Sequence, residues 1–65
     1  MNVLRKARIN HKLTQAEAAQ SIGISLSMLA KMEMGIKKPS YETMKKVAAF
    51  YHMTVDELFF ATNSH

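Results

Sequence analysis

The 65-residue sequence contains no cysteine, no tryptophan, two glycines and one proline. The absence of cysteine excludes disulfide bridges and thiolate zinc sites as sources of stability. A chain of this length holds one small domain, here residues 1–65, and a two-domain enzyme is excluded. Regular helix packing and association between copies therefore remain as the means by which this domain becomes stable.

Long apolar runs and enzyme motifs are also missing. No apolar run approaches the roughly 18 residues of a membrane-spanning helix, and the opening stretch MNVLRKARIN lacks the apolar core of a secretory signal. The sequence has no glycine-rich phosphate loop and no G-x-S-x-G motif. His11, His52 and His65 are far apart in sequence and form no i, i+4 pair, and cysteine is absent, so a metal site is not expected. We expect a cytoplasmic protein that is not an enzyme and needs no metal, cofactor or small-molecule ligand.

Basic and acidic residues are unevenly distributed along the chain. Residues 1–46 contain all nine lysines and arginines and three acidic residues, a net charge of +6. Residues 47–65 contain no base and two acids, a net charge of −2. A basic region of this kind favours a polyanionic partner, which is nucleic acid, an anionic membrane surface or an acidic protein. A membrane surface is the weakest of the three, because the bases are spread over several predicted helices rather than along one.

Capping residues and glycines predict two short helices in the middle of the chain. Thr14 and Glu17 form a capping-box pattern around the start of QAEAAQSI, and Gly23 ends that helix. Ser25 caps the following segment LSMLAKMEM, which stops at Gly35. Two helices separated by about three residues have the spacing of a helix-turn-helix.

Three further helices complete an all-α prediction with no sheet. One lies within residues 2–11, a longer one follows Ser40 and ends before His52, and a last one, VDELFF, follows the capping box of Thr54 and Glu57. Methionines at core spacing are expected to fill gaps in the core rather than to bind a soft metal. Apolar periodicity places in the core Leu4, Ala7, Met32, Tyr41, Met44, Val47, Ala48, Tyr51, Met53 and Phe59.

The window from residue 15 to residue 34 combines small, glycine and apolar positions at fixed offsets. Ala19 leaves room for the next helix, Gly23 makes the turn, and three apolar residues fill the space between the helices: Ile24, Leu29 and Met32. The phrases LTQAEAAQSIG, KMEMGIKKPS and TVDELF, in this order and at these distances, resemble the Cro/CI-type or XRE family of helix-turn-helix regulators over nearly the whole chain. The resemblance implies a compact five-helix lambda-repressor-like DNA-binding domain with its helix-turn-helix at about residues 15–34.

The same resemblance implies which residues contact DNA. In such motifs the second helix lies in the major groove and the preceding helix crosses the backbone. Lys31 suits guanine and Leu26 a thymine methyl, but the reading helix has few long polar residues, so phosphate contacts and DNA shape should carry much of the recognition. For Lys37 and Lys38 the other interpretation is a solvated loop, and for Gln15 it is a polar residue in the first turn of its helix. The expected DNA contacts are Gln15, Ser25, Leu26, Ser27, Ala30, Lys31, Lys37 and Lys38.

A salt bridge is also implied by the resemblance. Arg8 and Glu33 match positions that join the first helix to the end of the recognition helix in relatives. The alternative is a pair of independent, solvated charges, because ion pairs are difficult to infer from sequence.

All five aromatic residues follow residue 40. Adjacent residues of a helix cannot both face inward, so Phe50 and Phe60 are expected to be partly exposed. Scattered surface aromatics are common, but we expect a symmetric homodimer here, with the C-terminal helix at about residues 55–60 in its interface. The expected interface residues are Phe50, Phe60 and Ala61.

These observations predict a sequence-specific double-stranded DNA-binding transcriptional regulator. The predicted form is a dimeric repressor that binds a near-palindromic operator. The alternative is an antitoxin-like or other protein-interaction module that keeps the helix-turn-helix fold. The apolar residues of the reading helix, Leu26, Met28 and Met34, motivate that alternative.

Overall fold

The computed structural model describes residues 2–36 and 38–60, which form five helices and, within these ranges, no strand. The predicted all-α, five-helix fold is confirmed. None of the described helices is long and apolar enough to span a membrane. The helices are α1 (Val3–Asn10), α2 (Gln15–Ile22), α3 (Leu26–Glu33), α4 (Tyr41–Phe50) and η1 (Asp56–Phe60).

Side-chain caps determine where these helices begin. The Glu17 amide donates to Thr14 Oγ1 at 3.1 Å, and the Thr14 amide donates to Glu17 Oε1 at 2.9 Å. The same reciprocal pair forms between Thr54 and Glu57, at 3.0 and 2.9 Å. Both predicted capping boxes are therefore present. Each provides side-chain acceptors for two backbone N–H groups that lack a partner at the start of a helix.

A residue in a left-handed backbone conformation follows each of the helices α1, α2, α3 and α4. Gly23, with φ of +92°, closes α2, and its amide donates to the Ala19 carbonyl at 2.9 Å. His52 follows α4 with φ of +58°, as predicted for a residue that tolerates this region. Lys12 has φ of +59° after α1, which the sequence did not indicate.

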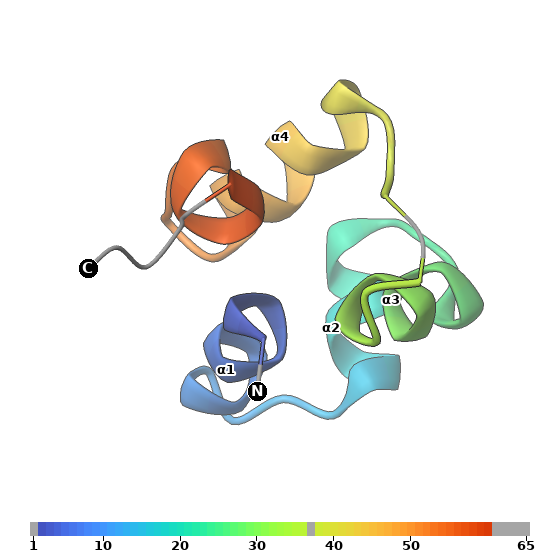
Figure 1. Cartoon of the computed structure of the whole chain (residues 1–65). Helices are drawn as coiled ribbons and strands as arrows, with labels where there is room; N and C mark the ends of the chain where they lie inside the picture. Colours follow the sequence, from blue (N-terminus) through green and yellow to red (C-terminus); the bar gives the residue numbers. More distant parts are fainter. Residues whose placement is uncertain (1, 37, 61–65) are drawn as a thin grey trace.

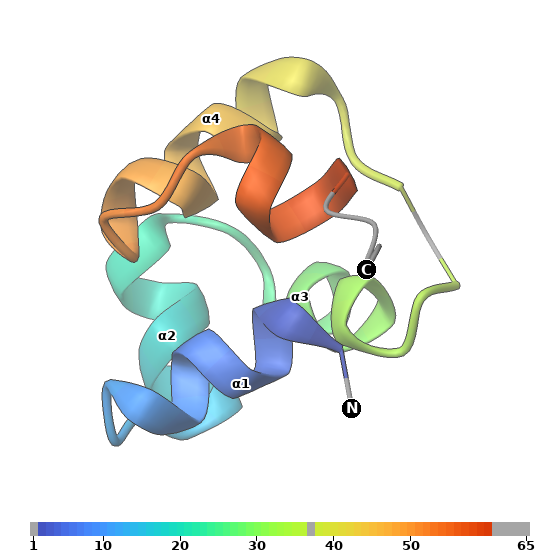
Figure 2. The ribbon, with the colours of Figure 1, turned by 60° about the vertical axis from the view of Figure 1, so that its left-hand side comes forward.

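The helices pack around one core, with α2 against α3, α1 against both α3 and η1, and α4 against α2 (Figure 1). Figure 2 shows η1 above α1, against which it packs. Leu29 of α3 and Val47 of α4 are the largest fully buried side chains. The remaining buried apolar side chains are Leu4, Ala7, Ala18, Ala19, Ile22, Met32, Met44, Ala48, Tyr51 and Leu58.

Two sequence predictions require correction. Tyr41 was expected in the core but is 62% exposed. It is the first residue of α4, directly after the cap, and the Lys45 Nζ lies 5.3 Å from its ring centroid. The last helix was expected to be α-helical, but Asp56–Phe60 form a π-helical turn. A capping box specifies where a helix begins and carries no information about the width of its turns.

Candidate nucleic-acid interface

The segment Gly23–Ser25 joins α2 to α3 in a tight turn, and the two helices share an apolar contact surface. Leu29 and Met32 are buried between α3 and the rest of the domain, and Ala19 is buried on the facing side of α2. A larger side chain at Ala19 would separate the two helices, so their close approach depends on this small residue. The turn and these contacts fix the direction in which α3 presents its other side.

The opposite side of α3 faces outward. Ser27 and Lys31 are exposed, Ala30 is half-buried, and Leu26 and Met34 are 49% and 69% exposed. This outward side contains every position that the sequence assigned to base contacts. We call Leu26, Ser27, Ala30, Lys31 and Met34 the outer face of α3.

Ser25 serves first as the cap of α3. Its Oγ accepts a hydrogen bond from the Met28 amide at 3.0 Å. The hydroxyl proton is not used by that bond, so Ser25 can still donate to an anion at the start of the helix. A shallow hollow at this end of α3 is lined by Ser25, Ser27, Met28 and Lys31.

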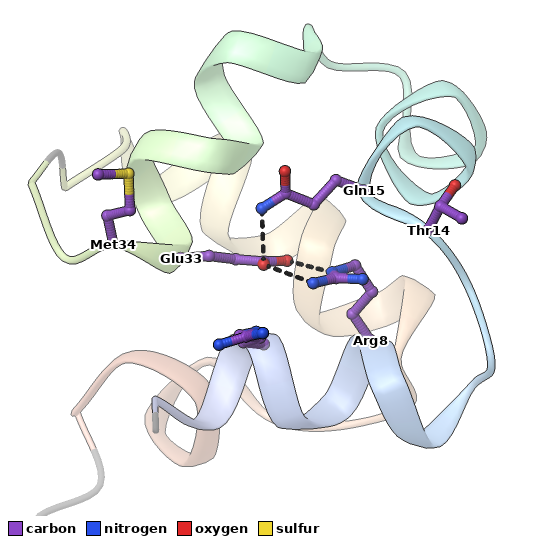
Figure 3. Close-up of a pocket in the computed structure, with 6 residues that line it drawn as sticks. Arg8, Thr14, Gln15, Glu33 and Met34 are labelled. Atoms are coloured by element: carbon purple, nitrogen blue, oxygen red, sulfur yellow. Dashed lines mark hydrogen bonds and ion pairs between the residues drawn. The ribbon is translucent and has the colours of Figure 1, made fainter.

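The structure brings Arg8, Gln15 and Glu33 together in one hydrogen-bonded cluster (Figure 3). Arg8 Nε lies 2.8 Å from Glu33 Oε2, and Arg8 Nη2 donates to Glu33 Oε1 at 3.1 Å. The side chains of Arg8 and Glu33 are 11% and 2% exposed, so the two charges are neither independent nor solvated. The hydrogen bond to Glu33 raises the pKa of the Arg8 guanidinium above its usual value, although burial acts against this shift.

Gln15 completes that cluster from the first position of α2. Its Nε2 donates to Glu33 Oε1 at 3.0 Å. Arg8 Nη1 also donates to the Leu13 carbonyl at 2.8 Å, just before α2 begins. Thus α1, α3 and the start of α2 are joined through one carboxylate.

Asn2 provides a further link between α1 and α3 that the sequence did not predict. Its side-chain oxygen accepts the Arg5 amide at 2.8 Å and so caps α1. Its Nδ2 donates to the Met32 and Glu33 carbonyls at 3.3 and 2.7 Å. One side chain therefore starts α1 and satisfies the carboxyl end of α3.

The loop after α3 contains two predicted phosphate contacts, Lys37 and Lys38. Lys37 lies outside the described residues. Lys38 is exposed, and its Nζ lies 5.0 Å from the centroid of the Phe60 ring, a cation–π contact. Sequence reasoning assigned Lys38 to DNA and Phe60 to a subunit interface without indicating that the two side chains touch.

The predicted interface residues differ in their surroundings. Phe50 is half-buried, and its ring centroid lies 5.0 Å from that of Tyr51 and 6.4 Å from that of His11. Phe60 remains 47% exposed. Ala61 lies outside the described residues. Of the interface residues that the structure describes, Phe60 therefore presents the larger free apolar surface.

Spacing alone gives no signal for the bond between Gln15 and Glu33, because the two residues stand on different helices 18 positions apart. The available indication of this bond was the inferred Arg8–Glu33 pair together with the short α1–α2 connection. Because Arg8 also donates to the Leu13 carbonyl, it holds the Glu33 carboxylate next to the start of α2.

Comparison with known proteins gives a match between residues 4–58 and the model of the helix-turn-helix family. The chain is 34% identical over 55 residues to the cryptic phage CTXphi transcriptional repressor RstR of Vibrio cholerae, covering 85% of this chain and 50% of that protein. It is 33% identical over 55 residues to the HTH-type transcriptional activator BcrR of Enterococcus faecalis, covering 85% of this chain and 27% of the relative.

An uncharacterized HTH-type transcriptional regulator of Methanocaldococcus jannaschii is 31% identical over 58 residues, which cover 89% of this chain and 88% of that protein. The chain therefore spans about half of the first relative, about a quarter of the second and most of the third. No solved structure matches the chain.

Proposed function

The chain belongs to the XRE-type helix-turn-helix family, and on this premise we propose that it binds double-stranded DNA and regulates transcription. The observation that carries the proposal is the outer face of α3. Ser27 is exposed there in the first turn beside Leu26, and Lys31 is exposed one turn further along, on a helix whose other side is buried against α2. A helix held in this way can enter the major groove with its first turns toward the base edges.

Few side chains on the outer face of α3 can contact base edges. Lys31 can donate to guanine O6 and N7, and Ser27 can bond either partner of a base pair. Leu26 offers an apolar surface to a thymine methyl group. With so few polar groups on the outer face of α3, part of the sequence preference comes from the shape and deformability of the duplex.

Phosphate contacts surround this face. Gln15 and the free amides at the start of α2 meet one strand, and the Ser25 hydroxyl meets the same region. Lys38, with Lys37 before it, supplies positive charge from the loop after α3. Such contacts hold the domain on any duplex and make its affinity fall with salt.

We further propose that two copies bind together as a repressor. A symmetric dimer through Phe60 and its neighbours would place two α3 helices on a near-palindromic site with half-sites about 34 Å apart. Such a repressor would act by occupying a promoter, and we propose that it does so in the cytoplasm, where the chromosome lies.

Sedimentation tests the dimer. Wild-type protein at micromolar concentration should sediment with twice the monomer mass, and Phe60→Asp should sediment as a monomer, because a buried carboxylate at the contact is unfavourable. Tyr41→Asp, a change at another exposed aromatic residue, is the matched control and should leave the mass unchanged. A monomeric wild type, or a Phe60→Asp protein with the dimer mass, contradicts the proposed interface.

A protein-binding role is the second candidate, and the exposure of Leu26 and Met34 favours it. In that case the outer face of α3 would contact another protein, as in an antitoxin-like module. Binding of the protein to DNA duplexes at low salt distinguishes the two functions. Retention of duplexes by wild-type protein supports DNA binding, whereas failure to retain any duplex from a random pool favours the protein partner.

A further inference from the structure

Gln15 is a residue of the proposed DNA interface, and its carboxamide is held from inside the domain. Its Nε2 donates to Glu33 Oε1 at 3.0 Å. Glu33 in turn is held by Arg8, which donates to both carboxylate oxygens. Glu33 is the one charged residue that is buried among residues 2–36 and 38–60.

The chemistry of Glu33 selects one orientation of Gln15. An ionised carboxylate accepts hydrogen bonds and donates none. The amide nitrogen of Gln15 must therefore face Glu33, because the opposite orientation would bring two oxygen acceptors together. Figure 3 shows the carboxamide in this orientation, with its oxygen pointing away from Glu33. One hydrogen of the Gln15 amide remains available for an external acceptor.

We propose that Glu33 is a positioning residue for DNA binding, which orients the Gln15 carboxamide before the duplex arrives. This inference rests on the proposed function, in which Gln15 donates to a phosphate oxygen. A free glutamine side chain must be immobilised when it binds, and prior ordering removes that cost. The buried ion pair thereby links α1 and α3 to a contact made by α2.

The direct test needs a folded protein without the Glu33 carboxylate. Glu33→Ala leaves the Arg8 guanidinium buried without its partner, so that variant is expected to be too unstable for the purpose. The double variant Arg8→Met with Glu33→Leu replaces the buried pair by apolar side chains of similar size, a change that proteins usually tolerate. It removes the acceptor from Gln15 and keeps the core filled.

Binding is measured on the duplex that wild-type protein enriches from a random pool. Gln15→Ala should weaken wild-type binding roughly three- to ten-fold, the worth of one hydrogen bond and its preorganisation. In the Arg8→Met, Glu33→Leu background the same change should weaken binding less than about two-fold. Gln20→Ala removes an exposed glutamine of the same helix and should have no effect in either background.

The free protein provides a second readout that does not depend on DNA. In wild-type protein, a charge-assisted bond should shift one Gln15 side-chain amide proton downfield of its Gln20 counterpart and slow its exchange with water. In the double variant the two glutamines should behave alike. Identical Gln15 and Gln20 amide signals in wild-type protein overturn the inference.

The binding outcomes separate this inference from the proposed function. Equal losses on Gln15→Ala in both backgrounds show that Glu33 only stabilises the fold, and no loss in wild-type protein shows that Gln15 makes no contact. Either result overturns the inference while DNA binding stands. Failure of wild-type protein to retain any duplex overturns the proposed function and this inference with it, even where the amide signals show Gln15 held by Glu33.

Discussion

The reading half of the domain, residues 15–34, and the C-terminal half, residues 41–60, are stabilised in different ways. Near the end of the reading half, the buried carboxylate of Glu33 accepts hydrogen bonds from Arg8 and Gln15. The C-terminal half contributes apolar side chains and aromatic contacts, including Val47, Leu58 and the paired rings of Phe50 and Tyr51. Its buried phenol oxygen, on Tyr51, has no hydrogen-bond partner within residues 2–36 and 38–60.

This difference relates stability to function. In the reading half, a buried polar group is paired, and the pairing extends through Gln15 to the surface that we expect to meet DNA. In the C-terminal half, the exposed ring of Phe60 and the buried core are separate, so the surface can change without disturbing a polar network. Removal of the buried polar group should therefore lower the free energy of unfolding strongly in the reading half. Removal of the buried hydroxyl in the C-terminal half should leave it nearly unchanged.

The largest effect is expected for Glu33→Ala. The change leaves the largely covered Arg8 guanidinium, whose side chain is 11% exposed, without its carboxylate and should lower the free energy of unfolding by about 3–5 kcal/mol. Urea unfolding measures this loss. Glu42→Ala, an exposed acidic residue in the first turn of α4, is the control and should change stability by less than about 1 kcal/mol. Equal stability of wild-type and Glu33→Ala proteins would show that the ion pair does not stabilise the fold.

Substitutions of two lysines distinguish base contacts from phosphate contacts at the proposed DNA interface. We propose that Lys31 reaches base edges, so Lys31→Ala should weaken binding to the preferred duplex by about 1–3 kcal/mol and relax the preference at one base pair. Lys38→Ala should weaken binding to all duplexes alike and make the salt dependence shallower by about one counterion. Titration of specific and random duplexes at several salt concentrations checks both. A uniform loss for Lys31→Ala contradicts its assignment to base reading.

The turn of the reading half is tested by Gly23→Ala. An added Cβ would have space, since its nearest neighbour is Lys46 Nζ at 3.9 Å, but φ of +92° is unfavourable for any L side chain. The cost should be about 1–2 kcal/mol in the free energy of unfolding. Urea unfolding is again the measurement, with Ala16→Gly on the exposed side of α2 as a control for helix propensity, expected to cost about 1 kcal/mol. An unchanged or increased stability for Gly23→Ala would mean that the turn does not hold this conformation.

The smallest effect is expected at Tyr51. Tyr51→Phe removes a buried hydroxyl without a described partner and should leave stability at neutral pH unchanged or raise it by up to about 1 kcal/mol. Urea unfolding at pH 7 measures this change. A loss of more than about 1 kcal/mol would show that the hydroxyl is paired in solution.

Alkaline pH gives the same residue a second readout. Burial raises the pKa of the Tyr51 phenol above its usual value of 10.0, and the Glu33 charge acts in the same direction. The folded protein therefore keeps this proton at pH values where the unfolded chain has lost it. The resulting contribution to stability is complete below pH of about 10 and is lost as pH rises above it. Wild-type protein should therefore lose more stability than Tyr51→Phe between pH 9 and pH 11 in urea unfolding, and equal losses would contradict this.

Local patterns in the sequence predicted most of the helix boundaries. A capping box or a glycine at a helix end acts within a few residues, so Thr14, Glu17 and Gly23 mark their helix in the sequence as they do in the structure. The same locality explains the error at Tyr41. Periodicity assigns it to the inner side of α4, but the position of the first turn relative to other helices depends on the whole fold.

In the candidate site, some features could be predicted from the sequence and others could not. Resemblance identified the outer face of α3, because the turn and the apolar side of the helix determine which positions point outward. The contacts of Gln15 with Glu33 and of Lys38 with Phe60 join residues on separate elements. Such contacts depend on the distances between folded helices, which single-sequence periodicity does not contain.

Selection of bound duplexes from a random pool at low salt tests the central claim most directly. Wild-type protein should enrich a near-palindromic sequence whose half-sites lie about 34 Å apart, and Lys31→Ala should enrich a version that is relaxed at one base pair in each half. Retention of no duplex by wild-type protein would contradict the assignment of α3 to DNA.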